Sequence, residues 1–171
     1  MAELTLQERL QPSLLDRLTD DEPGKTRESR NQSVMSLPKL RAAVLRDLAW
    51  LLNAGAFSPA EELDDYPLVA RSVLNYGLPD LAGRTVSTTD VVTIERLLRQ
   101  AIWDFEPRII RHTVKVRTLL GDSQLEHNAL TFEITGELWA QPSPEALFLR
   151  TEVDLESGDV RITGPQGAVA D

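Results

Sequence analysis

The chain has 171 residues, of which 42% are hydrophobic and 26% are charged, and this is enough for one globular domain with its own core. Its 18 basic and 27 acidic side chains give a formal net charge of −9, which argues against a nucleic-acid binder because phosphate neutralisation needs a basic surface. The absence of cysteine excludes disulfides and thiolate chemistry.

Two further features that the sequence lacks bear on the cellular compartment of the protein. No apolar run approaches the roughly 20 residues that span a bilayer. The first residues also lack the basic-then-apolar pattern of a secretion signal. We therefore expect a cytoplasmic protein without direct membrane insertion.

Residues 1–35 are expected to form a helical arm followed by a polar linker. Leucines recur at every fourth position, on one helix face: Leu6, Leu10, Leu14 and Leu18. Pro12 interrupts this stripe and would kink or split the helix. A single short helix cannot bury the stripe on itself, so the arm either packs on the domain or docks on a partner. Residues 19–33 are polar and charged, which is typical of a linker.

Ser36 is predicted to cap the next helix, with Pro38 in the first turn, where a missing amide hydrogen costs nothing. The expected buried stripe consists of Leu37, Leu40, Val44, Leu48 and Leu51. Asn53-Ala54-Gly55 is a suitable stop. Trp50 is expected in the core rather than at an interface. A further short helix is expected over Pro67–Leu74, ending at Asn75-Tyr76-Gly77.

The central helix is predicted to begin at an N-cap, Asp90, and to end before Pro107, which offers no amide hydrogen. Its apolar stripe is Val91, Ile94, Leu98, Ala101, Ile102 and Phe105. From Ile110 the period changes to two, which predicts a strand with His112, Val114 and Val116 toward the core. The junction is Glu106-Pro107-Arg108. Its acid and base are two residues apart in an extended segment, so both are expected to project to one exposed side as a contact point.

Three more strands are expected, near residues 130–138, 147–155 and 160–163. Charges suggest the register of the first hairpin: with residue numbers summing to about 248, Lys115 faces Glu133 and Arg111 faces Glu137. Helices followed by an antiparallel meander predict an α+β domain, with the helices on one face of a small sheet. We assign it to residues 36–163, with a loose tail over 164–171.

Catalytic and metal-binding patterns are missing from the sequence. There is no Gly-rich phosphate loop, HExxH or GxSxG, and two histidines without cysteine do not predict a zinc site. A carboxylate pair for glycoside hydrolysis is formally possible among Glu106, Glu133, Glu137 and Glu152. A solvated, charge-paired face explains these glutamates better. No catalytic residue, metal or cofactor is expected.

Five stretches, in order, resemble the TssE family, the baseplate subunits of bacterial type VI secretion systems, which are similar to a baseplate wedge protein of contractile-tailed phages. They are SLLDRLTDDEP at 13–23, LRAAVLRDLAWLLN at 40–53, SVLNYGLPDL at 72–81, FEPR at 105–108 and GELWAQP at 136–142. The family's Glu-Pro-Arg element maps onto Glu106, Pro107 and Arg108.

The resemblance implies an assembly role rather than catalysis. Such subunits sit in baseplate wedges beneath the inner membrane with TssF, TssG and TssK, where the sheath of TssB and TssC starts to polymerise. The alternative is a peptidoglycan hydrolase, because relatives have been labelled lysozyme-like. We expect Glu106 and Arg108 to serve assembly more than folding, since exposed charges contribute roughly 0–1 kcal/mol. We also expect the leucines of the arm to dock on a neighbouring subunit, and an edge strand to template the sheath.

Overall fold

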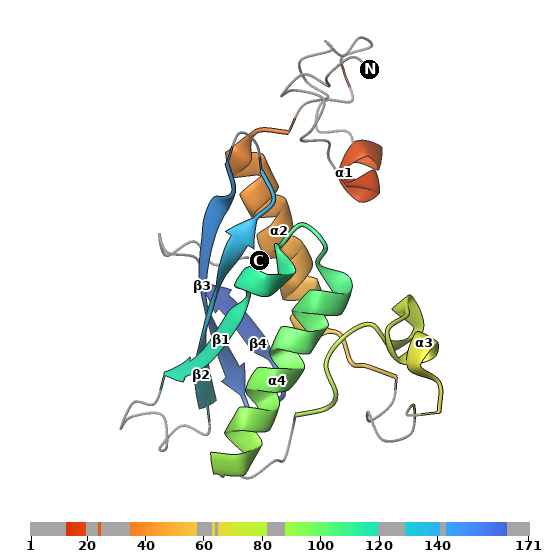
Figure 1. The fold of residues 1–171 in the computed structure, drawn as a ribbon, viewed down its shortest axis with the longest axis vertical. Coiled ribbons are helices and arrows are strands. Elements are labelled where there is room, and N and C mark those ends of the chain that lie inside the picture. The colour runs from red at the N-terminus through yellow and green to blue at the C-terminus, as the bar shows by residue number, and fades with distance from the viewer. Residues whose placement is uncertain are drawn as a thin grey trace.

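A computed structural model describes residues 13–19, 24, 35–57, 63, 65–81, 88–119, 129–140 and 143–163. Its centre is a four-stranded antiparallel sheet in the order β1-β2-β3-β4. The strands are β1 (Lys115–Leu119), β2 (Ala129–Leu138), β3 (Glu145–Asp154) and β4 (Val160–Thr163). Two long helices, α2 (Leu37–Asn53) and α4 (Thr88–Phe105), lie against one face of this sheet (Figure 1). The predicted α+β class, with helices on one face, is confirmed.

The core fills the space between the two helices and the sheet. Alternate residues of β3 are buried, from Leu147 to Val153, as the period of two predicts. On the helices, the fully buried side chains recur at spacings of three and four: Val44, Leu48, Leu51, Ile94, Leu98 and Ile102. One apolar layer therefore joins all the long elements of the described chain.

Helix α2 begins and ends as predicted. Ser36 caps it by accepting a hydrogen bond from the Lys39 amide at 3.4 Å, and the helix ends at Asn53. Two side-chain expectations were wrong. Leu37 is exposed although Met35 and Leu40 on either side of it are buried, so its side chain points away from the core. Trp50 is also exposed, with the Arg46 guanidinium 5.0 Å from its ring centre.

Helix α4 differs from its prediction at the start. It begins at Thr88, so Asp90 lies within the first turn instead of capping it. The end is as expected, because Phe105 is the last helical residue and Pro107 follows in a turn.

The segment after the turn is not yet a strand. Arg111–Thr113 form a single 3-10 turn, η4, which leaves His112 exposed rather than on the apolar face. The Trp103 indole nitrogen donates to the Arg111 carbonyl at 2.8 Å, and this tertiary bond holds η4 against α4. Regular pairing starts only at Lys115.

The first hairpin has the predicted faces with a different register. Val116 pairs with Ile134, and Arg117, rather than Lys115, stands opposite Glu133. The paired numbers sum to 250, two residues away from the expected value. A shift of two keeps every side chain on its face, whereas a shift of one would have inverted them. Arg111 lies outside the strand altogether.

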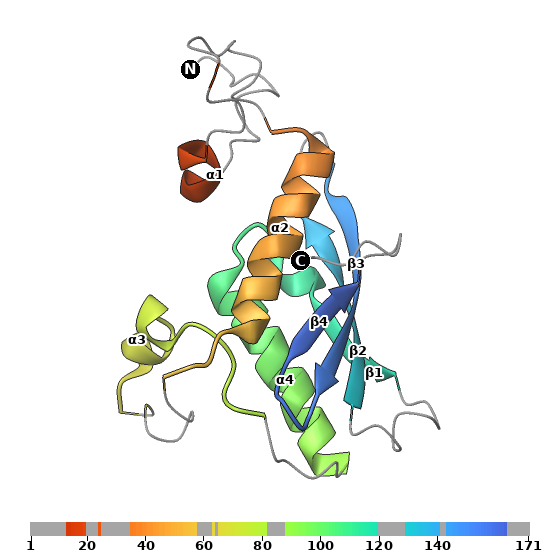
Figure 2. The ribbon, with the colours of Figure 1, turned by 180° about the vertical axis from the view of Figure 1, so that it is seen from behind.

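Short elements lie outside this layered body. Helix α1 (Leu14–Leu18) sits beside α2, and α3 (Pro67–Ala70) with the 3-10 turn η3 (Val73–Asn75) projects away from the sheet (Figure 2). The single helix expected over Pro67–Leu74 is wrong, because α3 ends at Ala70 and η3 follows as a separate 3-10 turn that includes Asn75. The segment does end by Gly77, which has a φ of 121°. Leu6, Leu10, Pro12, His127, most of the linker and the tail lie outside the described residues.

Candidate functional site: the Glu-Pro-Arg turn and its ion pairs

The Glu-Pro-Arg turn folds its two charged side chains onto each other. The Arg108 side chain donates to both Glu106 oxygens, from Nε at 2.7 Å and from Nη2 at 2.5 Å. The Arg108 backbone amide adds a bond of 3.1 Å to the same carboxylate. A bidentate pair of this kind is both strong and geometrically specific, so it fixes the exit of the chain from α4.

The pair continues into a network that reaches the amino-terminal helix. Arg108 Nη2 also donates to Asp47 on α2 at 2.6 Å. The other Asp47 oxygen accepts from Arg46, at 2.9 Å from Nε and 2.7 Å from Nη2. Arg46 Nη1 then reaches Asp16 of α1 at 2.7 Å. Acids and bases therefore alternate from the turn, across α2, to α1, where Ser13 also donates to Asp16.

Burial makes the centre of the network costly to break. Glu106 is only 4% exposed, while Arg108 keeps 23% of its side chain exposed. Burial alone would lower the pKa of Arg108, but hydrogen bonds and charge from Glu106, and then from Asp47, raise it. Arg108 Nη1 is buried and meets no hydrogen-bond acceptor among the described residues. The guanidinium is thus held charged and in one place.

At the α1 end of the network, burial and hydrogen bonds also act in opposite directions on the pKa of Asp16. Burial of Asp16 acts to raise its pKa, but hydrogen bonds from Ser13 and Arg46, and the charge of Arg46, lower it below the ordinary 3.8. On the inner side, Tyr76 packs edge-on against Phe105 with ring centres 5.2 Å apart. Burial, and the nearby charges of Asp47 and Glu106, raise the pKa of Tyr76.

The expected exposure of Glu106 is wrong. Its two oxygens point inward to Arg108, so this carboxylate is not presented to solvent. The same geometry disfavours Glu106 as the acid of a hydrolase, which would have to hold a proton. Glu137 and Glu152 are exposed, and Glu133 stands opposite Arg117 and Arg150 in the sheet. Within the described ranges, no group of three or more potential ligands could hold a metal ion.

The surface that the turn does present consists of Pro107, the edge of Arg108 and Trp139. Pro107 is exposed and Trp139 is 48% exposed. Trp139 is held beside the turn because its amide donates to the Arg108 carbonyl at 2.8 Å, and the Ile110 amide donates to Glu137 at 2.8 Å. A Cβ on Gly136 would lie 3.2 Å from the Ile109 side chain, so the small residue permits this close pairing. We call Pro107, Arg108 and Trp139 the turn face.

Several members of the site escaped the sequence analysis. The sequence pattern assigns no role to Asp47, Tyr76 or Trp139. The signal available in the sequence was the adjacent pair of opposite charges, Arg46 and Asp47. A charged pair on the face next to the apolar stripe can reach across to a neighbouring element.

Most residues of this site fall within a stretch that matches a known protein family. A model of the family described as baseplate wedge protein gp25 matches residues 38–143. The chain belongs to this family. The matched span runs from the first turn of α2 to just past β2, and it includes Arg46, Asp47, the Glu-Pro-Arg turn and Trp139. The wedge family thus covers the whole network except α1. No curated protein and no solved structure matches the chain.

Proposed function

We propose that this wedge-family protein is a TssE-like structural subunit of a type VI secretion baseplate and has no enzymatic role. One observation carries the proposal. The five stretches that resemble TssE, far apart in the sequence, each supply a residue at the Glu-Pro-Arg network. They contribute Asp16, Asp47, Tyr76, the Glu106–Arg108 pair and Trp139. Residues scattered for unrelated reasons would not meet at one place.

We assign the wedge contact to the turn face rather than to Glu106. The ion pairs hold Arg108, and the backbone bond from Trp139 to Arg108 holds the two chain segments together before a partner arrives. Such pre-organisation reduces the entropy cost of binding. Tryptophan and arginine are also the side chains that most often dominate binding energy. The proposed partners on this face are TssF, TssG and TssK.

The amino-terminal arm is proposed as a second contact with a neighbouring subunit. Leu14 and Leu18 are 72% and 74% exposed, and no residue of α1 is buried. The helix is tied to α2 by the ion pair between Asp16 and Arg46. Its leucines are therefore available, and deleting residues 1–20 should leave a folded domain that binds its partners more weakly.

The sheath contact is proposed at a sheet edge, by addition of a strand from TssB or TssC. Strands β1 and β4 are the two edges of the sheet. Each edge is partly guarded by a side chain: Glu95 accepts from the Thr118 amide at 2.7 Å, and Asn53 bonds both backbone groups of Val160 at 2.9 Å. Such guards limit promiscuous pairing until the correct strand arrives.

Co-purification tests the proposal. The tagged chain is expressed with TssF, TssG and TssK from the same organism, and we expect all three to be retained at high salt. A chain that returns alone would contradict the baseplate role. Purified chain is also added to cell walls in a turbidity assay, where we expect no clearing. Clearing that is lost on changing one glutamate would instead establish the hydrolase reading, for which no observation in the structure speaks.

A further inference from the structure

Helix α4 is tied to the chain that follows it at two points. At mid-helix, the Glu95 carboxylate accepts from the Thr118 amide at 2.7 Å and from the Thr118 hydroxyl at 2.6 Å. Near the end of the helix, the Trp103 indole nitrogen donates to the Arg111 carbonyl at 2.8 Å. Between these points α4 and β1 lie side by side (Figure 1). The side chains along this junction therefore come from two segments that are held in a fixed relation.

Cations gather along this junction. The Arg99 guanidinium carbon lies 5.7 Å from the centre of the Trp103 ring, and that of Arg111 lies 5.1 Å from the same centre. Arg96 stands three positions before Arg99, so the two are neighbours on the helix surface. Lys115 follows η4 as the first residue of β1. We call these four cations and Trp103 the basic seam.

Three of the four cations have no ion-pair partner. Within the described ranges, no carboxylate stands at ion-pair distance from Arg96, Arg99 or Lys115, whereas five other arginines there are paired. Even Glu137, which is exposed on the neighbouring strand, does not reach Lys115. A shortage of acids does not explain this, because the chain has 27 acidic and 18 basic side chains. The seam therefore has positive charge that the fold itself does not use.

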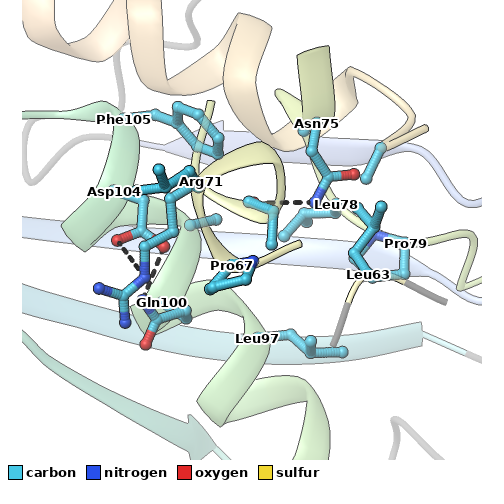
Figure 3. Close-up of a pocket in the computed structure, with 15 residues that line it drawn as sticks. Leu63, Pro67, Arg71, Asn75, Leu78, Pro79, Leu97, Gln100, Asp104 and Phe105 are labelled. Atoms are coloured by element: carbon cyan, nitrogen blue, oxygen red, sulfur yellow. Dashed lines mark hydrogen bonds and ion pairs between the residues drawn. The ribbon is translucent and has the colours of Figure 1, made fainter. Parts of the chain in front are cut away.

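The carboxylates of α4 nearest to the seam are already engaged. One Glu95 oxygen accepts both bonds from β1. Asp104 is only 11% exposed and lies toward α3, where it accepts from Gln100 at 2.7 Å and stands 3.9 Å from the Arg71 guanidinium (Figure 3). It also lies 3.6 Å from Arg111, which is 55% exposed. Arg111 is thus partly neutralised, and it still presents its outer side to solvent.

The number and placement of the charges select the occupant. Nucleic-acid binding depends on phosphate contacts spread over a basic surface, whereas this chain has a net charge of −9 and gathers four cations at one place. A short acidic segment of a protein would meet only the seam. Its carboxylates also match the planar guanidinium fork, which binds them with two parallel hydrogen bonds.

We propose that the basic seam binds a short acidic segment of a partner protein, with neighbouring carboxylates seated on Arg99 and Arg111 beside the Trp103 ring. Arg96 and Lys115 extend the contact along α4 and β1. This contact is additional to the turn face and to strand addition at a sheet edge. It does not depend on which assembly the chain serves.

The test uses the full chain, labelled with ¹⁵N, and two peptides, hexaglutamate and hexaglutamine. The reporters are the indole amide signals of Trp103 and Trp50. Trp50 is an internal control, because its neighbouring arginine, Arg46, is already paired with Asp16 and Asp47. We expect hexaglutamate to shift the Trp103 signal, less so as salt is raised, and to leave the Trp50 signal in place. Hexaglutamine should shift neither.

Two arginine variants make a matched comparison. Arg99→Gln and Arg161→Gln each remove one positive charge, and Arg161 is exposed on β4, at the other edge of the sheet. We expect Arg99→Gln to weaken hexaglutamate binding about threefold or more, and its combination with Arg96→Gln to weaken binding about tenfold or more. Arg161→Gln should bind as the natural chain does, and all four proteins should melt at the same temperature.

Four results would overturn the proposal. They are a Trp103 signal that hexaglutamate leaves in place, an equal response to hexaglutamine, and undiminished binding by the double variant. The fourth comes from titration with a single-stranded hexathymidylate. If it bound the seam more tightly than hexaglutamate, the seam would be a nucleic-acid site rather than a protein contact.

Discussion

Glu106 is the residue on which the site depends most. Its carboxylate is buried away from water. The cost of burying this charge is offset by one neighbour, Arg108, two positions along the chain. A buried ion pair contributes little net stability when it is replaced as a unit, but removal of one partner leaves an uncompensated charge. Either partner is therefore worth far more in the folded protein than an exposed charge would be.

We expect Glu106→Ala to lower the free energy of unfolding by about 3–5 kcal/mol, because Arg108 loses its two side-chain bonds to Glu106 and keeps only Asp47, which Arg46 already shares. Urea denaturation measures the change. Glu152→Ala is the matched control, since Glu152 is exposed on β3, and it should change the value by less than about 1 kcal/mol. Equal small effects of both variants would mean that the buried pair does not hold the turn.

Asp16 gives a pH-dependent test of the link to α1. Its pKa in the folded protein is lowered, so the ionised form is the one that stabilises. That contribution is fully present above the ordinary aspartate value of 3.8 and is lost as the pH falls through the lower, folded value. We expect Asp16→Asn to be less stable than the natural chain at pH 7 and equally stable near pH 2. A difference that persists at acid pH would show that the charge is not its source.

At this scale the sequence identified the turn but misjudged its environment. Two charged residues that are two positions apart in an extended segment are predicted to project to the same side of the chain, and Glu106 and Arg108 do so. That side faces Asp47, which lies 61 positions away along the chain. Local spacing contains no information about a partner at that separation, so exposure was inferred where burial holds.

Among the elements, local chemistry determined the boundaries that came out as expected. Ser36 and Pro38 start α2, Pro107 follows the end of α4, and alternation over 147–155 gives the buried face of β3. The failure was at residues 111–113, where alternation predicted a strand. There the bond from the Trp103 indole to the Arg111 carbonyl favours a 3-10 turn, a tertiary effect that periodicity cannot report.

The sheet edges provide the prediction at the scale of elements. The side-chain amide of Asn53 pairs with the β4 edge as a neighbouring strand would. Its nitrogen donates to the Val160 carbonyl, and its oxygen accepts from the Val160 backbone amide. We expect Asn53→Ala to lower the free energy of unfolding by about 1–3 kcal/mol, since two backbone groups of Val160 lose their hydrogen-bond partners. It should also promote self-association through β4, measured by sedimentation velocity. The stability of Asn53→Asp, which keeps only the acceptor, should lie between that of the natural chain and that of Asn53→Ala. A monomeric, fully stable Asn53→Ala protein would show that this edge needs no guard.

For the whole molecule, the described structure consists of a layered body and two appendages. The wedge-family span covers α2, α4, β1 and β2 of the body together with α3 and η3, and the ion-pair network connects the turn face to α1. Helix α3 projects away from the sheet (Figures 1 and 2). Among the described residues, no helix is long and apolar enough to cross a membrane. Many of the exposed large apolar side chains lie on α1 and on the segment that contains α3 and η3.

The affinity of the purified chain for a TssF–TssG–TssK complex tests this account most directly. Isothermal titration would compare the natural chain with Trp139→Ala on the turn face and with Val92→Ala, a control at another exposed apolar residue, on α4. We expect all three proteins to melt at the same temperature, the natural chain and Val92→Ala to bind alike, and Trp139→Ala to bind at least about thirtyfold more weakly, as for an interface hot spot. Failure of the natural chain to bind, or undiminished binding by Trp139→Ala, would contradict it.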